Sequence, residues 1–249
     1  MRDFEDSTLW RVSEFERVQL QTGGSGFARL GGPTVLPTTL LADLRQLEQG
    51  RAGHDALEVA AACVRHREPA LLCLGCDGLV WPITLFPQQM LYHAPRALDE
   101  ASATGLGSIA LLGVEPPGVR PPGHWMHERI AATQSYRPLE PLLWALALRG
   151  PRSYPLDEIA GTVAYRALKP VDDAIVMLGG AQRSAAQRLR RETVALRDIA
   201  SWPGMSVERA SRLLNGLYLT SALLATRAHP AARAQPAGLL GRWRNGPRT

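Results

Sequence analysis

Residues 71–86, LLCLGCDGLVWPITLF, decide how the first part of this chain folds, because two apolar runs flank a short polar turn. The first run, residues 70–74, has the length of a strand, and the second, residues 79–86, is rich in β-branched and aromatic side chains. Between them stands GCDG, and Asp-Gly is a typical hairpin turn. We therefore predict a β-hairpin near residues 70–86.

Two of the three cysteines, Cys73 and Cys76, lie at this turn in a Cys-x-x-Cys spacing that allows three interpretations. A zinc knuckle needs two further ligands, which Cys63 and His66 upstream would supply. A redox pair normally opens a helix, whose N-terminus lowers the thiol pKa, but the residues after Cys76 continue as a strand. The third interpretation, buried structural thiols, fits the hairpin best.

Helical and extended patterns alternate around the hairpin. Apolar residues at helical spacing predict helices over residues 36–50, 54–68 and 137–150, and Gly50 stands where a helix C-cap is expected. Residues 10–21 alternate charged and apolar side chains and are predicted to form short strands. The expected fold class is α+β, with an N-terminal mixed α/β body.

The composition is that of an ordinary soluble globular chain: 45% of the 249 residues are apolar and 20% are charged. Arginine supplies nearly all the positive charge, which is typical of a protein encoded by a GC-rich bacterial genome. No apolar run reaches the length of a membrane span, and the N-terminus has no secretory pattern. An odd number of cysteines then predicts a reducing, cytoplasmic location, with no membrane partner.

Charge divides the chain into two parts of opposite sign. Residues 181–249 hold 12 arginines against three acidic residues, a net charge of +9, whereas residues 1–180 carry −4. The double glycine at 179–180 coincides with this change. We predict a body over 1–180, a basic helical module over 181–228, and a disordered basic tail over 229–249, which is rich in Pro, Gly and Arg.

The basic module begins with a run, residues 182–202, that is predicted to be one long helix. Its continuation, LRDIASWPGMSVERASRLLNGLYLTSALLATR at 196–227, resembles the winged-helix/helix-turn-helix superfamily: a helix, a glycine-containing turn, a second helix capped by Ser206, and a strand. The resemblance implies that the second helix faces the ligand through Arg209, Arg212 and Asn215, with Arg190 and Arg191 near phosphates. Members of this superfamily also dock proteins, so a DNA partner and a protein partner stay equally open.

No nucleotide-binding, cofactor-binding or nucleophile-elbow motif occurs in the sequence, so no cofactor is predicted. The leading hypothesis is a non-enzymatic bacterial regulatory or signalling adaptor that binds its partner through the basic module. The alternative is a metal-dependent enzyme whose site assembles from residues distant in sequence, such as His66, Cys76, His124 and Asp173. The sequence indicates no oligomeric state.

Overall fold

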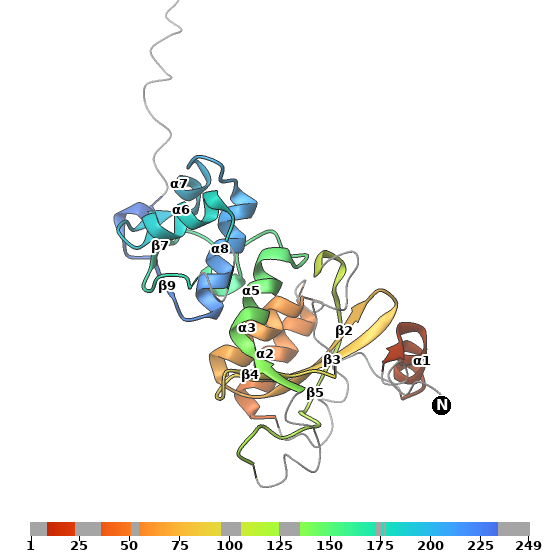
Figure 1. Cartoon of the computed structure of the whole chain (residues 1–249). Coiled ribbons are helices and arrows are strands. Elements are labelled where there is room, and N and C mark those ends of the chain that lie inside the picture. Colours follow the sequence, from red (N-terminus) through yellow and green to blue (C-terminus); the bar gives the residue numbers. More distant parts are fainter. Residues whose placement is uncertain are drawn as a thin grey trace, which may run out of the picture.

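The computed structural model describes residues 9–22, 36–50, 55–95, 106–124, 135–172, 176 and 178–233 (Figure 1). These residues form a mixed α/β structure. Its first part contains β1 (Trp10–Arg11), α1 (Val12–Thr22), α2 (Thr38–Gln49), α3 (Ala56–His66), β2 (Ala70–Cys76), β3 (Leu79–Phe86), β4 (Leu91–His93), β5 (Ala110–Glu115), β6 (Tyr136–Pro138) and α5 (Leu139–Arg149). Its second part contains β7 (Ala164–Ala167), α6 (Gly180–Leu189), β8 (Val194–Ala195), α7 (Leu196–Ala200), α8 (Val207–Leu219) and β9 (Leu223–Thr226). The 3-10 turns are η4 (Leu106–Ser108), η6 (Asp157–Ile159) and η7 (Pro230–Ala232).

The predicted hairpin is present and forms the centre of the first sheet. Strands β2 and β3 pair antiparallel from Ala70 opposite Leu85 to Cys76 opposite Leu79. The two turn residues, Asp77 and Gly78, have φ of 51° and 76°, the left-handed values that a two-residue hairpin turn needs. Further antiparallel strands extend the sheet to the order β5-β2-β3-β4-β6, with β1 also paired to β3.

Helices α2, α3 and α5 cover one face of this sheet (Figure 1). Every second residue of the hairpin points into the core that they share, including Leu72, Leu74, Ile83 and Leu85. Helix α3 begins at Asp55, whose carboxylate accepts hydrogen bonds from the backbone N–H of Leu57 and Glu58. The three helices therefore occur where the apolar spacing predicts them.

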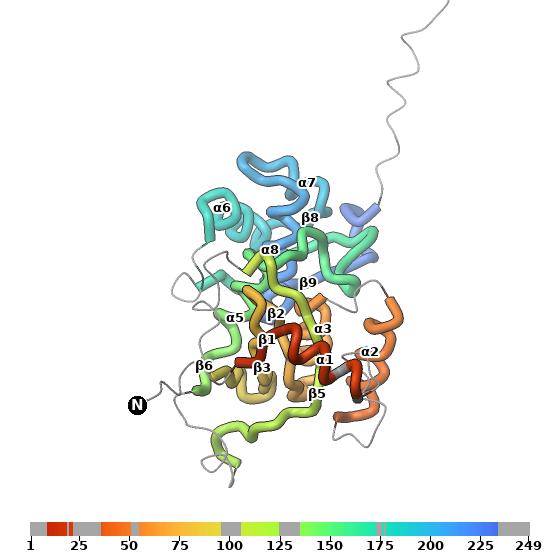
Figure 2. The backbone as a smooth tube through the Cα atoms, turned by 90° about the vertical axis from the view of Figure 1, so that its right-hand side faces the viewer, coloured from red at the N-terminus to blue at the C-terminus, as the bar shows by residue number. Residues whose placement is uncertain are grey.

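The second part of the chain is a three-stranded antiparallel sheet, in the order β8-β7-β9, packed with α6, α7 and α8. Both views place it at one end of the first part (Figures 1 and 2). Its central strand, β7, lies before residue 180 and pairs with β8 and β9 on either side. The predicted boundary at residue 180 thus falls between β7 and its two partner strands, and the sequence gives no local signal of this long-range pairing.

Two predicted elements are wrong. Residues 12–22 form helix α1 rather than strands, since Val12, Phe15 and Val18 are half-buried at helical spacing. The long helix over 182–202 is broken, because β8 pairs with β7 between α6 and α7. Of the predicted tail, residues 230–232 form η7 with Ala232 buried, and residues 234–249 lie outside the described part.

Among the residues described, no helix combines the length and the apolar character needed to cross a bilayer.

Candidate functional site

The hairpin separates the Cys-x-x-Cys pair instead of presenting it at a shared site. Side chains alternate along a strand, so Cys73 and Cys76, three positions apart in β2, point to opposite faces of the sheet. Cys76 lies with Leu72 and Leu74 in the core under the helices, and both thiols are buried. The two sulfur atoms therefore cannot ligate one metal ion.

The two upstream candidates do not complete a metal site either. Cys63 is fully buried in α3, and burial raises the pKa of its thiol to about 12, so it stays protonated at neutral pH. The Nε2 atom of His66 lies 2.7 Å from Oδ2 of Asp43 in α2. Within the described ranges, no three His, Cys, Asp or Glu side chains are arranged to hold a metal ion. Asp173, named in the enzyme alternative, lies outside those ranges.

Helix α8 faces the interior of the protein. Asn215 is fully buried: its Oδ1 accepts from the N–H of Leu156 at 2.9 Å, and its Nδ2 donates to the carbonyl of Tyr154 at 3.0 Å. Arg212 donates through Nη1 to the carbonyls of Leu148 and Gly150, at the C-terminal end of α5. Arg212 and Asn215, which were predicted to face a partner, thus bond residues 148–156 of the same chain, at the end of α5 and the start of the segment that connects α5 to β7.

The contact between α8 and α5 explains this orientation. Gly216 lies directly against the ring of Trp144, and a Cβ atom at residue 216 would come within 2.1 Å of Trp144 Cζ3. Trp144 is itself buried. Glycine thus lets the two helix backbones approach closely, and α8 fills the space between α5 and the second sheet (Figure 1).

The other predicted binding residues are exposed. Arg190 and Arg191 follow α6, and neither guanidinium makes an ion pair or hydrogen bond with any described residue. Arg209, near the start of α8, is also exposed and donates to the carbonyl of Gly204 at 2.6 Å. Arg188 in α6 and Arg197 in α7 are also exposed, and they pair with Glu192 and Asp198, respectively. This set (Arg188, Arg190, Arg191, Arg197 and Arg209) is called the arginine face below.

A buried ion-pair cluster, called the junction cluster, joins the first part of the chain to the segment that leads into the second. Its centre is Arg152, whose side chain is 1% exposed. The guanidinium lies 2.6 Å from Asp55, 2.6 Å from Glu58 and 3.1 Å from Asp157. It also donates to the carbonyls of Tyr154 and Pro155, so all its nitrogens have partners.

Three carboxylates share the one guanidinium of Arg152, and this excess of negative charge affects the pKa values of Glu58 and Arg152. Burial raises the pKa of Glu58, whose side chain is 2% exposed. The hydrogen bond from the backbone N–H of Asp157 and the attraction of Arg152 oppose this rise, whereas the carboxylates of Asp157 and Asp55 add to it. Burial alone would lower the pKa of Arg152, but Glu58 and Asp55 hold it above its ordinary value. The cluster is therefore a positive centre surrounded by excess negative charge.

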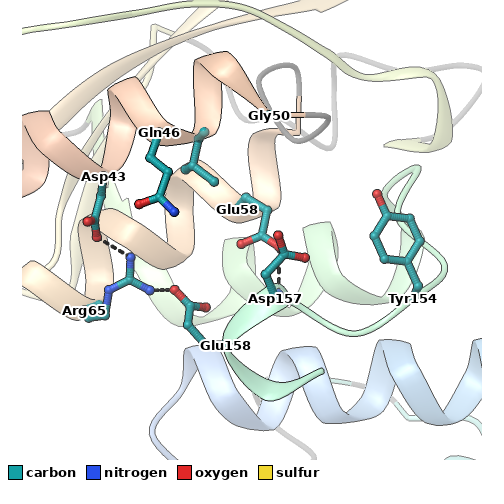
Figure 3. A pocket seen from close by; sticks show the side chains of 9 residues that line it. Asp43, Gln46, Gly50, Glu58, Arg65, Tyr154, Asp157 and Glu158 are labelled. Carbon is teal, nitrogen blue, oxygen red and sulfur yellow. Dashed lines mark hydrogen bonds and ion pairs between the residues drawn. The ribbon is translucent and has the colours of Figure 1, made fainter. Parts of the chain in front are cut away.

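A cavity of about 850 Å³ opens beside this cluster, between α2, α3 and the connecting segment (Figure 3). Arg65 crosses its wall and pairs with Asp43 on one side and Glu158 on the other. Burial raises the pKa of Asp43, but hydrogen bonds from His66 and Arg65 lower it more, so the carboxylate stays charged. The lining residues are Asp43, Gln46, Leu47, Gly50, Glu58, Arg65, Tyr154, Asp157 and Glu158.

Each carboxylate of the cavity wall already has a guanidinium partner. Asp43 and Glu158 bind Arg65, whereas Glu58 and Asp157 bind Arg152. The arrangement ties helices α2 and α3 to the segment that carries the second part of the chain. These ion pairs therefore have a structural role: they connect the two parts of the chain.

Comparison with protein-family models, with curated proteins and with solved structures gives no significant match for this chain.

Sequence reasoning missed the junction cluster. The spacing of Asp55 and Glu58 at the start of α3 is a capping signal, but it gives no indication of Arg152, 97 residues away from Asp55. Among 28 basic residues, nothing in the local sequence distinguishes Arg152 from an exposed arginine. Its only local signal is the position next to Pro151, directly after the helix-ending Gly150.

Proposed function

We propose that this protein is a non-enzymatic regulatory or signalling adaptor of the bacterial cytoplasm, whose basic, winged-helix-like second part docks an acidic partner protein. The observation that supports the proposal is the exposure of the arginines in the second part of the chain, although α8 itself packs inward. Arg212, Asn215 and Gly216 hold this helix against α5 and the connecting segment, while the arginine face points to solvent.

The same observation favours a protein partner over DNA. Base reading in a major groove needs a helix with a free polar face. Eight of the 13 residues of α8 are buried, and its polar residues Arg212 and Asn215 are bonded inside the molecule. At the exposed N-terminus of α8, Glu208 stands beside Arg209, and a carboxylate there disfavours contact with a DNA backbone. The exposed arginines suit the electrostatic steering of an acidic protein.

The test is affinity purification from the native cell with a charge-reversed variant. Arg190→Glu with Arg191→Glu removes two exposed charges that have no described partner, so the fold should persist. Arg166→Glu with Lys169→Glu, both exposed near β7, is the matched control with the same change in charge. We expect one partner to be retained by the wild type and the control, lost by the first variant, and released by salt.

A duplex-DNA binding assay supplies the opposing outcome. The proposal predicts at most weak, sequence-independent binding that falls steeply with salt. Sequence-specific binding by the wild type, or a partner equally well retained by the Arg190→Glu, Arg191→Glu variant, would refute it.

A further inference from the structure

The turn between α7 and α8 presents apolar side chains next to two fixed arginines. Residues 202–207 read WPGMSV, and Met205 closes the turn by donating its N–H to the carbonyl of Trp202 at 2.9 Å. Val207, at the first position of α8, is 57% exposed, and Pro203 is exposed as well. Trp202 and Met205 are half-buried, with one side packed on the core.

The arginines beside this turn are held in place by the protein itself. The guanidinium of Arg188 lies over the ring of Trp202, 4.5 Å from its centroid, and is bonded to Glu192 at 3.0 Å. Arg209 donates to the carbonyl of Gly204 within the turn at 2.6 Å. These two positive groups are therefore ordered before a partner binds, which lowers the entropic cost of binding, and a partner carboxylate would share Arg188 with Glu192.

We infer that this surface, called the turn patch (Trp202, Pro203, Met205, Val207, Arg188 and Arg209), binds an acidic segment of the partner that carries an apolar side chain between carboxylates. The inference rests on the proposed docking function and specifies which part of the arginine face makes the central contact. Carboxylates would pair with the two arginines, and the apolar side chain would cover Val207 and Pro203.

The composition of the patch supports this partner over a purely electrostatic one. Interfaces concentrate binding energy in apolar and aromatic anchors that are surrounded by polar groups, and arginine is enriched among them. A nucleic-acid backbone would use the positive charges alone and would leave Val207 and Pro203 exposed. An acidic segment with an apolar centre satisfies both features of the patch.

The experiment measures the binding of two fluorescent peptides by anisotropy. The first is a short glutamate-rich peptide with Phe-Leu at its centre, and the second has Ser-Ser in place of Phe-Leu. We expect the full chain to bind the first peptide about tenfold more tightly, which corresponds to about 1.4 kcal/mol. Val207→Ser should remove this preference, whereas Leu224→Ser, which changes an exposed leucine of β9, should leave it intact.

The outcomes separate the two proposals. Equal affinity of the wild type for both peptides, or an unchanged preference in Val207→Ser, overturns the turn patch, and the adaptor function then depends on the purification experiment alone. Failure of that purification experiment, with binding of the Phe-Leu peptide intact, overturns the adaptor function instead. Thermal melts of both serine variants establish that their folds match the wild type.

Discussion

Arg152 has more charged partners than any other residue of the junction, and its environment makes its replacement costly. Asp55 and Asp157 lie on separate elements. The guanidinium compensates the charge of Glu58, which is almost fully buried, and of Asp55, which is 14% exposed, whereas Asp157 is 70% exposed. Removing one partner of a buried ion-pair network leaves the others uncompensated.

We therefore expect Arg152→Ala to lower the free energy of unfolding by about 3–5 kcal/mol. Arg149→Ala, three residues earlier and exposed, is the matched control and should cost less than about 1 kcal/mol. Urea denaturation followed by circular dichroism measures both. Equal effects of the two variants would contradict a structural role for the cluster.

Glu58 makes stability depend on pH in a definite direction. Its pKa is raised in the folded protein above the ordinary 4.5, so the folded state binds the proton more tightly than the unfolded state. This contribution is fully present below pH 4.5 and is lost as pH rises through the raised pKa.

Relative to Glu58→Gln, which cannot ionise, the wild type should therefore lose stability as pH rises from 4.5 toward neutrality. The loss is about 1.4 kcal/mol for each unit by which the folded pKa exceeds the unfolded one. Urea denaturation of both proteins at stepwise pH measures the difference. If the wild type instead gains stability relative to Glu58→Gln as pH rises over this range, the pKa of Glu58 is lowered in the folded protein and the prediction is wrong.

At the scale of elements, the close contact between α5 and α8 determines how the second part of the chain is packed against the first. Alanine normally stabilises a helix relative to glycine by about 1 kcal/mol. At residue 216 the added methyl group would come within 2.1 Å of the ring of Trp144, which is buried.

Gly216→Ala should therefore destabilise the protein by about 1–3 kcal/mol, the usual cost of overpacking. Gly180→Ala, at the start of α6, is the control: a Cβ there meets nothing within 4 Å, so its effect should be small. Thermal unfolding distinguishes the two. A stabilising Gly216→Ala would mean that α8 is not held against α5.

The elements whose pattern is local were predictable from the sequence. The Asp-Gly turn predicted the hairpin, Gly50 the end of α2, and Ser206 the start of α8, where its Oγ accepts from the N–H of Arg209. Strands β7 and β8 were not predictable, because their pairing depends on residues far apart in the chain. For the same reason the inward position of Asn215 could not be read from its place on the polar side of a helix.

At the scale of the whole molecule, the change in the sign of the net charge does not coincide with a break in the apolar core. Net charge changes sign near residue 180, but the buried apolar residues form one continuous cluster that includes Leu72, Leu143, Tyr165 and Leu214. The basic second part is thus attached through an apolar contact and the junction cluster, which lets it present the arginine face in a fixed direction relative to the sheet of the first part.

A shared core predicts that the two parts unfold together. Because α5 and α8 bury Trp144 between them and Arg152 joins both sides, separating the parts would expose apolar surface and uncompensated charge. The full chain should therefore show one denaturation transition, with the same midpoint for near-ultraviolet and far-ultraviolet circular dichroism. In Arg152→Ala combined with Gly216→Ala the junction is weakened from both sides, and we expect the transition to broaden or divide. Two separate transitions in the wild type would instead indicate independent units joined loosely, and the arginine face would then have no fixed direction.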